Sequence, residues 1–380
     1  MKLYYKLFVI INIVLLTGCT ATPTMINTSV NPITENVPQT AVPTQTAVPT
    51  QTTGPTQTTG PTQTTGLLDA KYSLLVDKYD YDYAVWSPDS TMLAITGRFD
   101  ERIGIALFLL GSDKPKWFVE EEGATSLMFS TDGKYIVYAL RNNTLNFLDV
   151  ETGQKVREID GGESCTGRGF NNAILADGNQ YYTVGTDYVR SPDRHKSELA
   201  VWNSDANSCE LITLTLGWPV SLELNNNGFL LLNLAFVGIE DHDEIQVWDM
   251  RTNQQTCVIT TSDGDDWIRG LLHPDRNEMI VFSSDGRAVW DVTTCEVTEV
   301  ISNTNDGRIE AFDPTGNRYV MYADGTLSFW DAHAHALLSQ TDDLPDSNYL
   351  IELRFDPSGS YLLAVFGGSP DVLVVWQLEP

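Results

Sequence analysis

The chain has 380 residues, and its 51 acidic and 23 basic side chains give a formal net charge of −28. All but three of the charged residues follow residue 66, so residues 67–380 carry 21 basic and 50 acidic side chains. A surface this acidic repels phosphate backbones and anionic lipid headgroups. We therefore expect no nucleic-acid partner and no binding to a negatively charged membrane surface.

Residues 1–18 have the parts of an export signal. Two lysines precede an apolar run of ten residues, Leu7 to Leu16, which is too short to cross a bilayer as a helix. The sequence LTGC, which ends at Cys19, resembles the bacterial lipobox, and this implies cleavage before Cys19 and acylation of its sulfur. We predict a lipoprotein signal peptide; the alternative is an ordinary secreted protein with an unmodified Cys19.

Residues 19–66 form a tether rich in threonine, proline and glutamine. Glu35 is the only charged residue of this segment, and the hexapeptide PTQTTG is repeated in tandem from Pro49. Such a composition has little apolar surface to bury, so we expect the segment to be disordered. Acyl chains on Cys19 would anchor it in the lipid bilayer, because each buried methylene contributes about 0.8 kcal/mol. The prediction is an exported protein, lipid-anchored in the cell membrane and facing the cell surface or the periplasm.

A turn motif recurs seven times, at intervals of 40 to 50 residues. Its copies WSPDS, FSTDG, LADGN, LNNNG, LHPDR, FDPTG and FDPSG begin at Trp86, Phe129, Leu175, Leu224, Leu272, Phe312 and Phe355. Apolar runs suited to buried strands follow the turns, and a later strand ends in Trp-Asp or a related pair. Each repeat therefore predicts an inner strand, a tight turn, two middle strands and an outer strand.

One four-stranded unit cannot cover both of its faces, so the units must stack, and a radial arrangement leaves only short edges. The repeats resemble those of the WD40 family, which implies an all-β, seven-bladed β-propeller over residues 67–380. The resemblance implies structural roles within the blades for Trp248, Asp249, Asp285, Trp290, Asp291, Asp324, Trp330 and Asp331. No repeat has the family's Gly-His pair, and exported propellers with tandem Ser-Pro-Asp-Gly turns are an alternative class.

The seventh repeat ends at Pro380 without an outer strand. Residues 70–77, AKYSLLVD, precede the first turn and are spare in the repeat pattern. We expect this segment to supply the missing strand and so to close the ring between the two ends of the domain.

Residues 67–380 contain no recognised motif for a catalytic centre. No nucleotide loop, zinc-protease helix or Gly-x-Ser-x-Gly elbow is present, and the predicted inner strands LMFS, AIL and ELRF offer few candidate groups. His333 and His335 would supply only two metal ligands, so we expect them in a solvent-exposed turn. No catalytic residue, metal site or cofactor is predicted.

Four cysteines lie in the predicted propeller: Cys165, Cys209, Cys257 and Cys295. An even number in an exported protein permits two disulfides in three pairings. The last three fall near the start of outer strands in successive repeats, where we expect neighbouring blades to splay apart. A disulfide needs Cα atoms within about 7 Å of each other. The sequence therefore leaves two alternatives for these cysteines, free thiols or disulfides.

Many acidic residues fall in loops that should share one face of the propeller, the face of the connections between repeats. The candidate binding residues on this face are Asp80, Asp82, Asp263, Asp265, Asp266, Asp342, Asp343 and Asp346. These residues suit the binding of a cationic partner or a divalent ion. The alternative is that they only keep the surface soluble, because surface loops are usually polar.

The function predicted from these features is a monomeric, non-catalytic binding scaffold, in part by analogy with a family that mostly holds protein contacts. Its partner would be a protein, peptide or glycan, and the acidic face would suit a cationic one. Two alternatives are a propeller hydrolase or lyase with a site in the central channel and a binding module that depends on a divalent cation.

The lipobox resemblance makes a direct prediction for Cys19. Replacing Cys19→Ser removes the sulfur that the acyl chain needs, so metabolic labelling with palmitate should be lost. Labelling that persists in this variant would place the anchor elsewhere.

Overall fold

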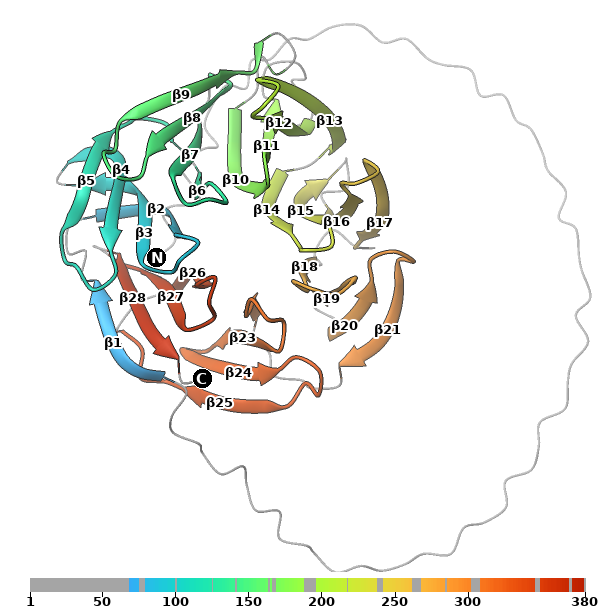
Figure 1. Ribbon diagram of the computed structural model, residues 1–380. Coiled ribbons are helices and arrows are strands. Elements are labelled where there is room, and N and C mark those ends of the chain that lie inside the picture. Colours follow the sequence, from blue (N-terminus) through green and yellow to red (C-terminus); the bar gives the residue numbers. More distant parts are fainter. Residues whose placement is uncertain are drawn as a thin grey trace, which may run out of the picture. The chain divides into compact units, whose positions relative to one another are not determined.

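Seven four-stranded antiparallel sheets stand around a central axis in the described part of the chain (Figure 1). The computed structural model describes residues 68–74, 79–99, 101–124, 126–140, 142–162, 165, 169–187, 196–216, 218–237, 242–261, 268–283, 286–301, 308–345, 349–368 and 371–378. They belong to one compact unit, Gly60–Pro380. The signal peptide, Cys19 and the tether lie outside the described residues. Within them, no helix is long and apolar enough to span a membrane.

Six of the sheets are formed by four strands that are consecutive in the chain, and each runs from an inner to an outer strand. The first three are β2 (Tyr79–Trp86), β3 (Met92–Phe99), β4 (Arg102–Leu109), β5 (Pro115–Glu120); β6 (Leu127–Phe129), β7 (Tyr135–Leu140), β8 (Thr144–Asp149), β9 (Lys155–Asp160); β10 (Gly169–Asp177), β11 (Gln180–Asp187), β12 (Lys196–Asn203), β13 (Ser208–Leu216). The next three are β14 (Trp218–Leu224), β15 (Phe229–Val237), β16 (His242–Asp249), β17 (Gln254–Thr260); β18 (Ile268–Leu272), β19 (Glu278–Ser283), β20 (Gly286–Asp291), β21 (Glu296–Ile301); β22 (Arg308–Phe312), β23 (Arg318–Ala323), β24 (Thr326–Asp331), β25 (Leu337–Thr341).

The seventh sheet joins the two ends of the domain, as the repeat pattern predicts. Its inner strand is β26 (Tyr349–Phe355), its two middle strands are β27 (Tyr361–Gly367) and β28 (Val372–Leu378), and its outer strand is β1 (Leu68–Leu74). β1 pairs antiparallel with β28 from Leu68 opposite Leu378 to Leu74 opposite Leu373. The expected donor segment is confirmed, although the strand begins two residues earlier than expected.

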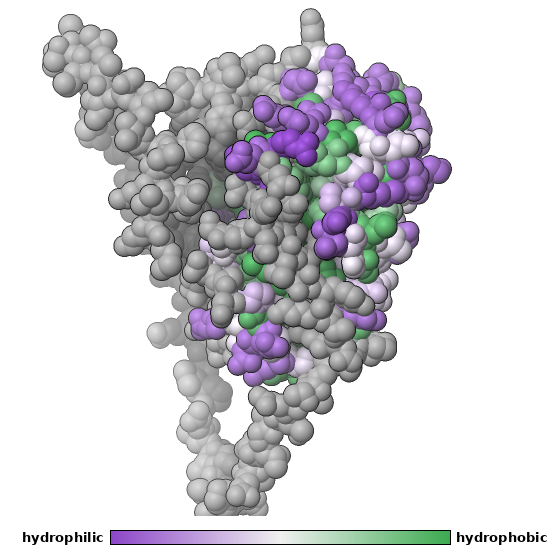
Figure 2. Space-filling model, turned by 90° about the vertical axis from the view of Figure 1, so that its left-hand side faces the viewer, coloured by the Kyte–Doolittle hydropathy of each residue, from purple (hydrophilic) through white to green (hydrophobic). Residues whose placement is uncertain are grey.

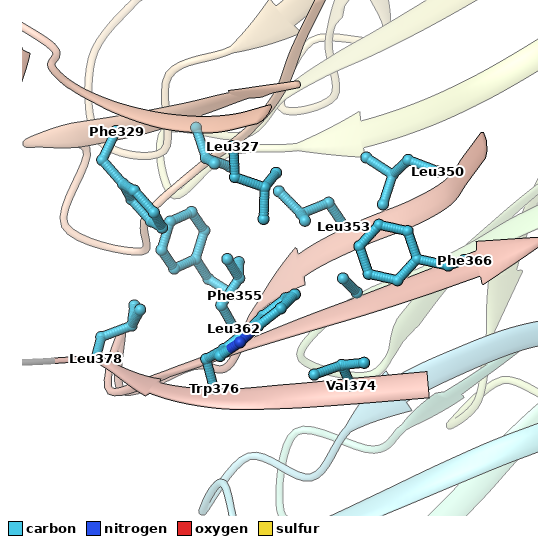
Figure 3. Packing of buried hydrophobic residues seen from close by; sticks show 12 residues of the cluster. Leu327, Phe329, Leu350, Leu353, Phe355, Leu362, Phe366, Val374, Trp376 and Leu378 are labelled. Atoms are coloured by element: carbon cyan, nitrogen blue, oxygen red, sulfur yellow. The ribbon is translucent and has the colours of Figure 1, made fainter. Parts of the chain in front are cut away.

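The hydrophobic core is divided among the gaps between neighbouring sheets. Among the described residues, each of seven apolar clusters combines side chains from two adjacent sheets. In the cluster between the sixth and seventh sheets, Leu327 and Phe329 from β24 meet Leu353, Phe366 and other side chains of the seventh sheet (Figure 3). Each sheet is therefore stabilised from both sides, since burial contributes roughly 25 cal/mol per Å² of apolar surface.

The outer rim is much more polar than the gaps. Every residue of β21 except the last is exposed, and β9 is exposed at all but one position. The side of the molecule shown in Figure 2 mixes hydrophilic residues with smaller hydrophobic areas in its described part. The acidic side chains can therefore be solvated without disturbing the packing between sheets.

The recurrent turn motif connects the inner strand to the next strand in all seven sheets. In five of the seven copies the side chain of the second residue accepts a backbone N–H from across the turn: for example, Met92 N donates to Ser87 Oγ at 2.9 Å, and Tyr361 N donates to Asp356 Oδ1 at 2.5 Å. This side-chain bond replaces a backbone pairing that the tight turn cannot make, which is why polar residues recur there.

Two disulfides join neighbouring sheets near the rim. Cys165, which follows β9, pairs with Cys209 in β13, and Cys257 in β17 pairs with Cys295, just before β21. The Cα atoms are 6.3 Å and 5.0 Å apart, so the expected splaying of the blades at these positions is wrong. The turns and outer strands of adjacent sheets approach closely enough for the bridges to form.

Ring closure predicts the effect of removing β1. Deleting residues 68–74 leaves the edge of β28 unpaired, so the melting temperature should fall and aggregation should increase. A loss of about 2 kcal/mol would lower the melting temperature by roughly 3 °C in a domain of this size, because the entropy of unfolding is about 2.1 cal/mol/K per residue.

The matched control is deletion of residues 20–66, which removes only the tether and should leave the melting temperature unchanged. Equal melting temperatures for the two truncated chains, measured by circular dichroism, would contradict closure by β1.

Candidate functional site

The inner strands enclose a cavity of about 560 Å³ in the central channel. Its described lining residues come from five sheets, mainly from the inner strands β2, β14, β18, β22 and β26. The charged residues in the wall are Glu223, Arg269, Glu310, Glu352 and Arg354. Ligand pockets typically measure 300–1,000 Å³, so this cavity can accommodate a small ligand or a side chain of a partner.

The alternation of side chains along each strand places these charges at the channel. In β26, Leu353 and Phe355 point into the gap toward the sixth sheet, where both are buried. Glu352 and Arg354 have the opposite orientation, toward β2 of the first sheet, because successive side chains alternate in direction. The inner end of the gap opens into the channel, so these polar side chains line it.

Arg354 is held in place by two neighbours. Its guanidinium donates to Tyr83 Oη at 3.0 Å and lies over the Tyr83 ring, with Cζ 4.8 Å from the ring centre. It also forms an ion pair with Glu352 Oε1 at 2.5 Å. Burial alone would lower the pKa of Arg354, but the Glu352 carboxylate and the Tyr83 hydroxyl outweigh it and raise the pKa. For Glu352, burial raises the pKa, and Arg354 opposes this shift.

Glu223 is in a different electrostatic state. Its Oε2 accepts the backbone N–H of Leu272 in the next sheet at 2.8 Å. Burial raises the pKa of the carboxyl group to about 7, and the Leu272 N–H and the charges of Arg269 and Arg354 only partly offset that shift. Among the described residues, neither arginine forms an ion pair with Glu223. The group is therefore divided between its neutral and ionised forms near neutral pH.

This cluster corrects the expectation that the inner strands offer few candidate groups. The signal was present in the repeats: Glu223 and Arg354 each lie two residues before the second residue of a turn motif, and Arg269 and Glu352 each lie four residues before it. Charged residues at equivalent positions of different repeats must meet at the axis of the ring. Aligning the repeats by their turns would have identified the cluster before the structure.

The predicted acidic face is only partly within the described residues. Asp342 and Asp343 are exposed in the connection between β25 and β26. Asp80 and Asp82 lie in the inner strand β2 and not in a loop, because the first inner strand begins at Tyr79. The remaining candidate residues, Asp263, Asp265, Asp266 and Asp346, lie outside the described residues.

The Trp-Asp aspartates cap the turns between the third strand and the outer strand. Asp291 Oδ1 accepts the N–H groups of Thr293 and Thr294, both at 2.8 Å. Asp249 accepts from the N–H of Arg251 at 3.0 Å, and Asp331 makes equivalent bonds in the sixth sheet. These aspartates therefore accept the N–H groups that the tight turn leaves without strand partners.

The other predicted blade residues are three tryptophans and two aspartates. The indole of Trp330 donates to Ser328 Oγ at 2.9 Å, and that of Trp248 donates to Gln246 Oε1 at 3.1 Å. Trp290 packs, partly buried, against the cluster between the fourth and fifth sheets. Asp324 lies in the β23–β24 turn with a φ of 46°, and Asp285 lies outside the described residues.

The two histidines of AHAHA are in a turn, but they differ in exposure. The side chain of His333 is exposed, whereas that of His335 is 9% exposed and packs against the Tyr319 ring, with the ring centres 6.1 Å apart. The expectation that both are exposed is therefore wrong for His335. In the part of the chain that the structure describes, no group of three or more His, Cys, Asp or Glu side chains is arranged to hold a metal ion.

Solved structures share this architecture at low sequence identity. The WD40 repeats of RRP9 align with a TM-score of 0.57 and 15% identity, covering 81% of this chain and 97% of that one. The structure of U3-55K aligns with the same score and identity, covering 81% of this chain and 98% of that one. No protein-family profile and no curated protein sequence matches the chain. The fold is therefore that of a WD40-like seven-bladed β-propeller.

The raised pKa of Glu223 predicts a pH-dependent stability. Its pKa is about 7 in the folded chain and 4.5 ordinarily, so the unfolded state releases its proton first. Stability is retained below pH 4.5 and is lost as the pH rises through 7. The variant Glu223→Gln stays neutral, so its melting temperature should exceed that of the natural chain by a few degrees at pH 8 and by less at pH 4.5.

The control is Glu122→Gln, which removes one charge from an exposed position in the β5–β6 connection. Differential scanning calorimetry at both pH values would reject the assignment if the two variants changed the melting temperature equally.

Proposed function

We propose that the protein is a non-catalytic binding platform that works outside the cytoplasm. In this proposal a lipid on Cys19 anchors the chain, residues 19–66 form the tether, and the propeller presents its loops and channel to a partner. The partner is a protein, peptide or glycan, and a cationic one suits the net charge of −28. The resemblance of residues 16–19 to a lipobox supports the anchor.

The two disulfides support an exported location. Disulfides persist in oxidising compartments and are rare in the cytosol of most organisms, where thiols are kept reduced. All four cysteines of the propeller are paired, through Cys165–Cys209 and Cys257–Cys295. An exported, lipid-anchored chain would fold where both bridges can form.

The cavity in the channel is the observation that carries the binding role. It combines a volume suited to a ligand with converging polar groups from several sheets, the usual character of a binding site. Arg354 is engaged by Glu352 and Tyr83, so these groups hold one another in place. Preorganised groups of this kind favour binding because little side-chain entropy is lost when the ligand arrives.

A hydrolase or lyase with its site in the channel is the second candidate, and Glu223 is the observation that favours it. A carboxyl group whose pKa is about 7 can act as a general acid or base near neutral pH. Arg269 lines the same cavity and could stabilise a negative charge on a substrate. The scaffold is the better supported of the two, because no recognised catalytic motif accompanies Glu223.

The binding role is tested by capture of a partner from intact cells, with the full-length chain as bait. The acidic-face variant replaces six aspartates with asparagine: Asp263, Asp265, Asp266, Asp342, Asp343 and Asp346. We expect weaker binding of the captured partner and a smaller dependence on salt, because the summed field of these charges speeds association.

The control variant removes six exposed acids from the opposite face and the outer rim by amide substitution: Asp113, Glu151, Asp205, Asp275, Glu296 and Glu299. Affinity that falls equally in both variants would reduce the effect to net charge. Failure to capture any partner with the natural chain would argue against a platform.

A further inference from the structure

We infer that the cavity in the channel is a site for one cationic side chain, lysine or arginine, of a partner polypeptide, and that Glu223 is its counter-ion. The inference rests on the proposed binding function and names the chemical group that this site takes. It depends on the geometry of Glu223, the balance of charges in the cavity wall and the apolar surface beside them.

Glu223 has an oxygen available to a ligand. Oε2 accepts the N–H of Leu272, whereas Oε1 has no hydrogen-bond or ion-pair partner among the described residues. A carboxylate removed from bulk water without a counter-ion is unfavourable, which is why burial raises its pKa. A cation that enters the cavity would supply the missing partner and favour the ionised form.

The charge balance of the wall favours a cation over an anion. The cavity wall has three carboxyl groups, Glu223, Glu310 and Glu352, and two guanidinium groups, Arg269 and Arg354. Arg354 already has Glu352 as its ion-pair partner at 2.5 Å, so it is poorly placed to attract an anion. The strongly acidic chain adds a long-range field that draws cations toward the molecule.

The apolar part of the wall suits the aliphatic stem of such a side chain. The same cavity is lined by the apolar residues Val220, Leu222, Leu271 and Ile351, and Val220 is 50% exposed. Lysine and arginine side chains pack their methylene groups on apolar surface while the charged end reaches a polar partner. The cavity presents both kinds of surface, which an inorganic cation would not use.

The test uses small probes with the full-length chain in detergent. Nα-acetyl-lysine methylamide and Nα-acetyl-arginine methylamide are titrated by calorimetry at pH 6 and pH 8, with Nα-acetyl-norleucine methylamide as the uncharged probe. We expect the two cationic probes to bind and the norleucine probe to bind at least tenfold more weakly. Binding of the cationic probes should be tighter at pH 8, because fewer Glu223 groups need to lose a proton first.

Two variants test the role of Glu223. Glu223→Gln keeps an oxygen for the Leu272 N–H but has no charge, so it should weaken binding of the cationic probes about tenfold or more at pH 8. The exposed-site control, Glu122→Gln, should leave binding unchanged. Equal binding of the lysine and norleucine probes to the natural chain would overturn the inference whether or not either variant folds. Unchanged affinity in folded Glu223→Gln would also overturn it.

The experiments distinguish failure of the channel site from failure of the proposed binding function. If a partner is captured from cells equally by the natural chain and by Glu223→Gln, the platform stands and the channel site is rejected. If the cationic probes bind through Glu223 but no partner is captured, the channel site stands and the platform is rejected.

Discussion

Each sheet of this protein has two apolar faces, and this requirement for two neighbours governs the rest of the structure. An open stack of seven sheets would leave two faces in water, whereas a ring leaves none. The pairing of β1 with β28 holds that ring closed with the backbone hydrogen bonds of one added strand. The seven apolar clusters between adjacent sheets are the energetic result, and each depends on the ring remaining closed.

Closure also creates the channel. The inner strands converge on the axis, and side chains at the inner ends of the gaps have no neighbouring sheet to pack against. Polar residues can be accommodated there, and Glu223, Glu352 and Arg354 occupy such positions. Arg354 and Glu352 compensate each other's charge, whereas the half-buried Glu223 has no ion-pair partner among the described residues. The same geometry that stabilises the ring thus produces a site with an unusual carboxyl group.

The rim is exposed to water, whereas the gaps between the sheets are buried. Outer strands such as β9 and β21 are exposed, so they can carry the charges that keep the acidic chain solvated. The disulfides lie beside this rim and each joins two sheets that are consecutive in the chain. Bridges between adjacent sheets restrict the unfolded chain over a loop of about 40 residues, for which chain entropy predicts roughly 4 kcal/mol each. They reinforce a ring that the apolar clusters already hold together.

The sequence by itself determined the repeat architecture of this protein. Seven turn motifs, the buried runs that follow them and the spare segment before Trp86 were sufficient to predict the sheets, their number and the closing strand. These features are local, because turn chemistry and the alternation of apolar residues act over a few neighbours. The tertiary structure alone decided which cysteines pair and which groups contact each charge, since Cys165 and Cys209, or Glu223 and the N–H of Leu272, become neighbours only when consecutive sheets stack. Their proximity depends on the distance and orientation between sheets, which no local pattern in the sequence encodes.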